Sequence, residues 1–394
     1  MKRKQNNSVR ITVFILILLV IISIDPSIKH LDGSYSYEDE PSEITPVITE
    51  KADKVEPVIY IKEEMEINGK PQVVYFLTLD LSDSELSVFP VLAKDRIFGF
   101  ELLSEMDKRY EALASVNAGF NFSYGQPSGF LVSNGRILTG SLGYGRILLI
   151  KDKKAWFVDA PAEVWIECDG EKIPVDWVNP YPAEQGIIIY TPEYGPTDRI
   201  DKRHSVCVVK NGKVVSSGIF DTEAEIPDDG YLIVDLEIEK SVISRFYAGQ
   251  EVMIRWVDQA EQGYQCSGSL VENGVNVAKD TDPWAGSMEI PTPRTAVGIR
   301  DDSTLVFVVV DGRQPGYSIG VTGKQLADIL ISAGVTEAAL LDGGASSQMI
   351  VDGRIVNKPS TGKERLIASA FITRHKMSTT SIDGEHLLPR PDSE

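Results

Sequence analysis

The sequence predicts an α+β fold in which many short strands form a mixed sheet core and helices are few. Two observations point to it. Apolar and β-branched runs recur along the chain and are joined by Asn-Gly or Asp-Gly dipeptides, whereas helical periodicity is scarce. We expect this folded part to cover residues 57–375, with its functional loops at strand ends.

Three dipeptides predict tight hairpins. Asn134-Gly135, Asn211-Gly212 and Asp352-Gly353 each separate two apolar runs. Asn, Asp and Gly tolerate the positive φ angles that two-residue hairpins require. These dipeptides are strong signals for turns and weak signals for function.

Two segments predict helices. One covers roughly residues 98–113, and the other starts at Thr322. Thr322 and Gln325 have the spacing of a capping box, in which each side chain bonds the other residue's backbone N–H. Gly334 is placed to end this second helix.

The N-terminus predicts export from the cytoplasm. Residues 1–24 combine a basic start with an apolar run over residues 11–24, which is typical of a signal peptide or an uncleaved signal anchor. As a helix this run is roughly 21 Å long, short of the ~30 Å hydrocarbon core. Residues 25–56 are acidic and predict a disordered spacer, and residues 376–394 predict a disordered tail. The body is therefore expected outside the cell, either tethered to the membrane or secreted.

Composition excludes some classes of protein. A net charge of −19 argues against nucleic-acid binding, which needs Lys and Arg to neutralise phosphates. The three cysteines, Cys168, Cys207 and Cys266, form no Cys-x-x-Cys pair and are expected to be partly buried apolar residues. The oligomeric state is left open.

The segment from residue 304 to residue 348 concentrates the chemistry. Buried strands are predicted at 305–310 and 338–341, with the capped helix between them. Such a unit predicts a neighbouring parallel pair, so Asp311 and Asp342 would follow strands at the same sheet edge. Two carboxylates at one edge can divide acid, base and nucleophile roles, although an Asp-Gly after a strand is also a common structural turn.

Other residue types near these carboxylates suit an anionic ligand. Glycines let backbone N–H groups approach a ligand, serines donate hydroxyls, and arginines present planar forks to phosphate oxygens. The candidates are Gly343, Gly344, Ser346, Ser347, Arg294 and Arg313.

Absent motifs narrow the reaction. Of the four histidines only His204 lies well inside the body, so a Ser–His–Asp triad has almost no candidate base. The Gly-x-Ser-x-Gly, His-Glu-x-x-His and P-loop patterns are missing. Asp280 and Asp282 could join the Asp-Gly turns around a hard cation, but no recognised ligand spacing is present. We predict neither a metal nor a cofactor.

Four segments carry short motifs. They are residues 115–120, with Asn117 in an Asn-Ala-Gly-Phe stretch, residues 293–298, with a Pro-Arg-Thr-Ala motif, the Asp-Gly-Arg stretch 310–317, and the Asp-Gly-Gly loop 341–347. In this order they resemble the phosphodiester glycosidase family. The resemblance spans about residues 75–374 in the family's order. Asn121 and Ala345 depart from the family pattern, and Ala345 could reshape its loop if that position needs a positive φ.

The resemblance implies hydrolysis of a sugar from a phosphodiester at the C1–O bond. It places Asn117, Arg294, Asp311, Arg313 and Asp342 on signature positions. Our hypothesis assigns Asp342 as base or nucleophile, Asp311 as orienting substrate or sharing proton transfer, both arginines as phosphate ligands, and Asn117 as a ligand of a sugar hydroxyl or phosphate oxygen.

Three functions follow in order of preference. The first is a hydrolase acting on a glycosyl phosphodiester in a surface polymer or exopolysaccharide, with an anionic glycan as its partner. The second is a non-catalytic protein that binds or scaffolds surface polysaccharide. The third is a metal-dependent phosphodiesterase.

Overall fold

A seven-stranded sheet carries the chemistry-bearing strands in the computed structural model, which describes residues 57–300 and 304–376. Every neighbouring pair in this sheet is antiparallel. In spatial order its strands are β1 (Val58–Ile67), β2 (Lys70–Leu79), β23 (Leu305–Val310), β22 (Arg294–Ile299), β24 (Glu337–Leu340), β18 (Ser269–Glu272) and β19 (Val275–Asn276). The two buried strands predicted around the helix are confirmed as β23 and β24.

The prediction that these two strands are neighbours is wrong. β22 lies between them and pairs with both, with Arg294 opposite Val310 and Ala296 opposite Leu340. All six residues of β22 are buried, which suits the central position in the sheet that the local pattern could not reveal. Because β23 and β24 are both antiparallel to β22, they still run in one direction. Asp311 and Asp342 therefore follow strands that end at the same edge.

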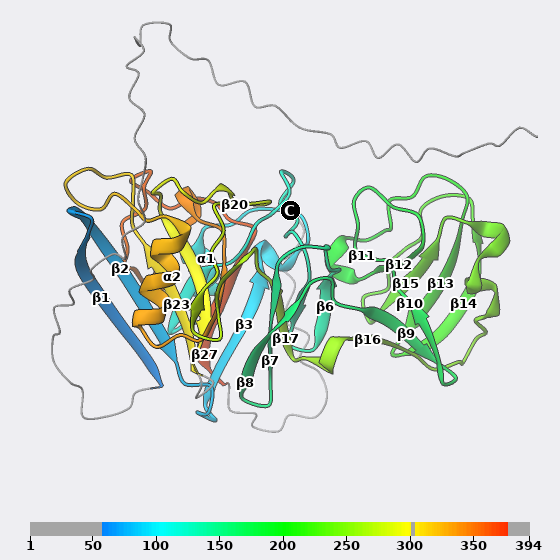
Figure 1. The fold of residues 1–394 in the computed structure, drawn as a ribbon. Coiled ribbons are helices and arrows are strands. Elements are labelled where there is room, and N and C mark those ends of the chain that lie inside the picture. The colour runs from blue at the N-terminus through cyan, green and yellow to red at the C-terminus, as the bar shows by residue number, and fades with distance from the viewer. Residues whose placement is uncertain (1–56, 301–303, 377–394) are drawn as a thin grey trace, which may run out of the picture. The chain divides into compact units, whose positions relative to one another are not determined.

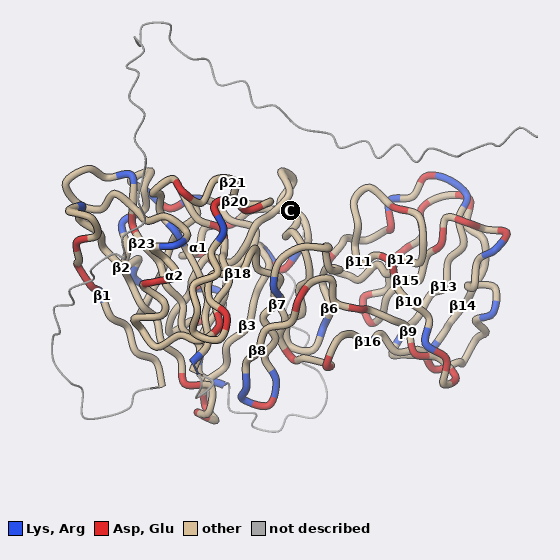
Figure 2. Tube along the Cα trace, in the orientation of Figure 1, with Lys and Arg blue, Asp and Glu red and all other residues tan. Residues whose placement is uncertain are grey.

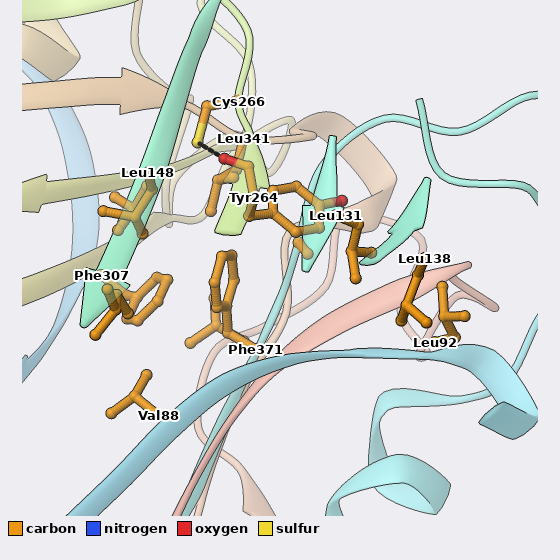
Figure 3. Packing of buried hydrophobic residues seen from close by; sticks show 14 of the residues in the cluster. Val88, Leu92, Leu131, Leu138, Leu148, Tyr264, Cys266, Phe307, Leu341 and Phe371 are labelled. Atoms are coloured by element: carbon orange, nitrogen blue, oxygen red, sulfur yellow. Dashed lines mark hydrogen bonds between the residues drawn. The ribbon is translucent and has the colours of Figure 1, made fainter. Parts of the chain in front are cut away.

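A second antiparallel sheet packs against the first. Its order is β26 (Arg354–Ile355), β25 (Met349–Val351), β4 (Ala114–Asn117), β27 (Ser369–His375) and β3 (Leu86–Leu92). Rings from three strands meet in the core beside it (Figure 3): Phe307 of β23 lies 4.9 Å from Phe371 of β27, and Tyr264 lies 5.1 Å from Phe371 on the other side. This core supports the strands that lead to the site.

The remaining strands form four further sheets. One comprises β6 (Arg136–Thr139), β5 (Leu131–Ser133), β17 (Gln262–Gln265), β7 (Arg146–Lys151) and β8 (Lys154–Asp159). Another comprises β11 (Trp177–Val178), β12 (Ile187–Tyr190), β15 (Gly230–Asp235), β13 (His204–Lys210) and β14 (Lys213–Phe220). The smallest two are β10 (Glu171–Pro174), β9 (Val164–Cys168) and β16 (Val252–Trp256), and the hairpin β20 (Thr281–Asp282) with β21 (Gly286–Ser287). In the described residues only β11 and β12 pair in parallel.

Both predicted helices are present. α2 (Gly323–Ser332) has the expected capping box: Gln325 N donates to Thr322 Oγ1 at 3.2 Å, and Thr322 N donates to Gln325 Oε1 at 3.0 Å. Gly334 follows it with φ +79°. α2 (Figure 1) lies against β18 and β19, and its buried residues belong to the same hydrophobic cluster as those of β22, β23 and β24. α1 (Leu103–Arg109) is shorter than predicted, because Gly99 and Glu111 take positive φ on either side of it.

Short 3-10 helices occur in the loops. They are η1 (Ala93–Asp95), η2 (Pro192–Tyr194), η3 (Ile238–Lys240), η4 (Val242–Arg245), η5 (Val257–Gln259) and η6 (Gly344–Ser346). The three predicted hairpin turns are confirmed, since both residues of each dipeptide have positive φ between paired strands. The cysteines are buried and unpaired, as expected.

The predictions for the two ends of the chain concern mostly residues that the structure does not describe. The signal or anchor at 1–24, the spacer at 25–56 and the tail from residue 377 onward belong there. Within residues 57–300 and 304–376, no helix is long and apolar enough to cross a membrane. Figure 2 shows Lys and Arg interspersed with Asp and Glu along this part of the chain.

Candidate functional site

Three strands of the seven-stranded sheet bring the predicted site residues to one edge. β23 ends at Asp311, β24 leads into Asp342, and the antiparallel β22 begins at Arg294. Leu341 N donates to Thr295 O at 2.9 Å, so the first residue of β22 lies beside the loop that starts at Asp342. The sheet register thus places Arg294 against the Asp342 loop.

The Asp342 loop turns sharply after β24. Gly344 N donates to Pro293 O at 2.8 Å, and Gly344 has φ +63°, which favours glycine. A Cβ on Gly343 would lie 2.9 Å from Pro293 O, so that glycine allows a close backbone approach. Ala345 is not among the residues with positive φ, so its departure from the family pattern causes no backbone strain.

Asp342 has an acid-base character suited to catalysis. Burial of its carboxyl raises its pKa to about 6, while the Ser346 hydroxyl and the charge of Arg365 act in the opposite direction. A group with this pKa changes protonation near neutral pH, where a general base or acid is most useful. Its backbone is held in place as well, because Asp342 N donates to Ala118 O at 3.1 Å.

Three arginines surround this loop without a carboxylate partner. Within the described part of the chain, Arg294, Arg313 and Arg365 form no ion pair, although the protein contains 58 Asp and Glu residues. The Arg313 guanidinium lies 3.3 Å from where a Cβ of Gly344 would be. Unpaired cations gathered beside glycine backbone are the arrangement that binds an anion.

The arginines differ in exposure. Arg294 is 3% exposed, and its guanidinium donates to the carbonyl oxygens of Val321 at 3.3 Å and Ile290 at 3.1 Å. Burial lowers its pKa to about 10, so it remains a cation at neutral pH. Arg313 and Arg365 are exposed. The buried Arg294 therefore adds positive potential to the site without contacting solvent, whereas the exposed Arg313 and Arg365 can contact a ligand directly.

Asn117 joins the two sheets at the site. Its Nδ2 donates to Asp342 O at 2.7 Å and to Ala118 O at 3.1 Å, and its Oδ1 accepts from Thr295 Oγ1 and Gln348 N, each at 3.0 Å. Two donors and two acceptors are the full capacity of an amide side chain. Asn117 is 1% exposed, so the structure places it as a clamp on the Asp342 loop. Its predicted role as a substrate ligand stays a prediction.

Asp311 is also buried and fully engaged. Its carboxylate accepts hydrogen bonds from Tyr75 at 2.9 Å, Tyr317 at 3.2 Å, Asn357 at 3.0 Å and the backbone N–H of Lys358 at 2.9 Å. Burial raises the pKa of Asp311 against the effect of these bonds. This geometry suits positioning of the 357–358 segment more than contact with a substrate.

The two serines take different places. Ser347 is 2% exposed and shares a hydrogen bond of 3.1 Å with Thr295 Oγ1. The Ser346 hydroxyl lowers the pKa of Asp342, against the larger effect of burial. Of the two, Ser346 is the one that acts on the titrating group.

Several residues of the site had no signal in the sequence. Tyr264 accepts a hydrogen bond from Gly119 N at 2.7 Å and so supports the segment that holds Asp342. Gln348 accepts from Arg365 N at 3.0 Å and donates to Arg365 O at 3.1 Å, which positions that arginine. Each contact joins segments far apart in the chain, so local patterns could not reveal it.

The aspartates considered for a metal are occupied by other partners. The Asp282 carboxylate accepts from Ser267, Tyr144 and the backbone N–H groups of residues 268, 284 and 285. Asp280 forms an ion pair with Lys324 at 3.3 Å. Among the described residues no three His, Cys, Asp or Glu side chains are grouped to hold a metal ion.

Comparison with known proteins confirms the family resemblance. Residues 197–374 match the sequence model of the phosphodiester glycosidase family. Three of the four motifs read from the sequence lie inside this range, and the Asn117 segment lies before it.

Individual proteins are similar to this chain in sequence or in fold. An uncharacterized protein from the SPβ prophage of Bacillus subtilis is 40% identical over 105 residues, which is 25% of this chain and 16% of that protein. A hypothetical protein from Synechocystis is 20% identical with a TM-score of 0.67, covering 85% of this chain and 64% of its own. A Burkholderia pseudomallei protein described as exported is 22% identical with a TM-score of 0.59. The match covers 77% of this chain and 74% of that protein. At these identities the two solved structures show the fold alone.

Proposed function

We propose that this protein is an extracytoplasmic hydrolase that cleaves a sugar from a glycosyl phosphodiester. The observation that carries the proposal is a buried carboxyl, Asp342, beside the unpaired guanidinium groups of Arg313 and Arg365. A carboxylate that titrates near neutral pH can act at an anomeric carbon, while the arginines stabilise the departing phosphate. The family match over residues 197–374 supports the same reaction class.

In this reaction the C1–O bond breaks and its electron pair leaves with the phosphate oxygen. Water supplies a hydroxyl to C1 and a proton that ends on buffer or phosphate, so the products are a free sugar and a phosphomonoester. Asp342 either takes the proton from water or attacks C1 first. Because a phosphomonoester is a good leaving group, one catalytic carboxyl is sufficient. Asp311 and Asn117 act as positioning residues in this scheme.

The substrate we propose is a surface polymer or exopolysaccharide. An N-terminal signal or anchor would bring the protein to the side of the membrane where such polymers lie. The basic and apolar pattern of residues 1–24 supports this location. A structural neighbour is itself described as exported. Binding of surface polysaccharide without catalysis is the second candidate, favoured by the exposed arginines, which would bind an anionic glycan with or without turnover.

The test is hydrolysis of an N-acetylglucosamine 1-phosphodiester in ¹⁸O-labelled water, with and without a chelator. We expect label in the released sugar and the same rate in both conditions. Label in the phosphate, lost with the chelator, would support the metal-dependent phosphodiesterase instead. Binding of the phosphodiester without turnover would support the second candidate.

A further inference from the structure

The segment after Asn117 carries aromatic side chains away from the Asp342 loop. Phe120, Phe122 and Tyr124 alternate along it, and Phe120 lies 5.7 Å from Trp284, ring centre to ring centre. A backbone bond of 2.8 Å from Phe122 N to Gln126 O, with one of 2.9 Å from Gly125 N to Phe122 O, closes the segment into a defined loop. The rings are therefore held in place and not on a loose strand.

Beyond Phe120, one half-buried ring and three exposed rings form a cluster that we name the aromatic patch: Phe98, Phe122, Tyr124 and Tyr181. Phe122 is 39%, Tyr124 36% and Tyr181 48% exposed. Phe122 and Tyr124 are stacked at 5.5 Å, and Tyr181 meets Tyr124 edge-on at 5.6 Å. Phe98 supports Tyr124 and Tyr181 from a third side, and Tyr124 Oη donates to Tyr181 O at 3.0 Å. Contiguous exposed rings of this kind mark binding surfaces.

The patch also carries a positive charge. The Arg199 guanidinium lies 4.7 Å from the centre of the Phe98 ring. Arg199 is exposed and has no ion-pair partner in the part of the chain that the structure describes. In a protein of net charge −19, an unpaired cation beside exposed rings favours a ligand that is apolar on one face and anionic elsewhere.

Only a short stretch of chain separates the patch from the candidate active site. Ala118 O bonds Asp342 N, and four residues of extended chain from Ala118 to Phe122 span at most about 14 Å. A chain of sugars joined by phosphates fits both ends of this path, because a pyranose ring has an apolar C–H face that stacks on aromatic rings, and its phosphates suit Arg199 and Arg313.

We propose that the aromatic patch binds additional sugar units of a poly(glycosyl phosphate) chain whose scissile phosphodiester lies at Asp342. The proposal rests on the proposed function and adds to it that the substrate is a polymer. It does not require that the patch contribute to bond cleavage.

The experiment compares a dimer and a hexamer of N-acetylglucosamine 1-phosphate, by calorimetric binding and by turnover. We expect the hexamer to bind at least 10-fold more tightly than the dimer to the unmodified protein. Phe122→Ala and Tyr181→Ala should each remove most of that difference while leaving dimer turnover unchanged. Tyr247→Ala, which alters a tyrosine 59% exposed elsewhere, is the matched control and should retain the difference.

The outcomes separate the two proposals. Equal affinity for dimer and hexamer, failure to bind the hexamer, or unchanged length dependence in both patch variants would overturn the patch proposal. A patch variant that changes the oligomeric state and not glycan binding would overturn it too, in favour of a second copy as occupant. Length-dependent binding without release of sugar from either oligomer would count against the proposed hydrolysis and in favour of the patch.

Discussion

Replacing Asp342 by Asn should inactivate the protein and stabilise it at the same time. The pKa of Asp342 is raised from 3.8 to about 6, so the ionised carboxyl costs the folded state up to about 3 kcal/mol at pH 7, at 1.36 kcal/mol per pKa unit. The native state binds the extra proton between pH 3.8 and pH 6. The cost is therefore full above pH 6 and disappears below pH 3.8.

Asn has nearly the same shape and no charge, so Asp342→Asn removes this cost. We expect urea unfolding, followed by tryptophan fluorescence, to show a gain of up to about 3 kcal/mol at pH 7 that shrinks as pH falls toward 4. Turnover should drop by at least ~100-fold, as for loss of a general base or nucleophile. A gain in stability together with a loss of turnover would be the behaviour of a residue that serves chemistry at a cost in stability.

Asp352→Asn is the matched control, because it makes the same change in an exposed Asp-Gly turn. It should leave turnover unchanged and alter the free energy of unfolding by no more than about 0.5 kcal/mol. Full activity in Asp342→Asn would remove Asp342 from the mechanism. A variant no more stable than the unmodified protein at pH 7 would refute the burial reasoning.

Three further outcomes are expected. Arg313→Gln should raise KM about 10- to 100-fold and weaken inhibition by the phosphomonoester product. The unfolding midpoint should not change, because the exposed guanidinium forms no ion pair with any residue that the structure describes. An unchanged KM would exclude Arg313 from the phosphate site. Gly119→Ala places a Cβ 2.8 Å from the Tyr264 ring, so the free energy of unfolding should fall by about 1–3 kcal/mol and turnover should fall with it. Unchanged stability and turnover would mean that the loop can shift freely. His204 bonds Asp198 at 2.8 Å with both side chains fully buried, and its pKa is raised, so the pair stabilises below pH 6.5 and loses that contribution as pH rises through the folded pKa. The destabilisation caused by His204→Gln should thus be larger at pH 6 than at pH 9, and a pH-independent difference would contradict the pairing.

The predicted site residues show which properties of a site can be predicted from local sequence pattern. Asp342 has the environment expected of a catalytic carboxyl, and Gly343 and Gly344 make the close backbone approach that their residue type suggested. Asp311 and Asn117 looked equally functional in the sequence. Their polar atoms are already hydrogen-bonded, a property that depends on partners far along the chain.

By itself the sequence determined the local features of this protein: the strand-rich composition, the hairpin turns, the capped helix from Thr322, and the two buried strands that lead to Asp311 and Asp342. Each depends on residues within a few positions of one another. The tertiary structure alone decided that β22 separates those strands, that Arg365 joins the arginines of the site, and that four rings gather into an aromatic patch. These features arise from strand pairing and packing between distant segments, and no short-range pattern encodes which distant partner a strand or side chain will find.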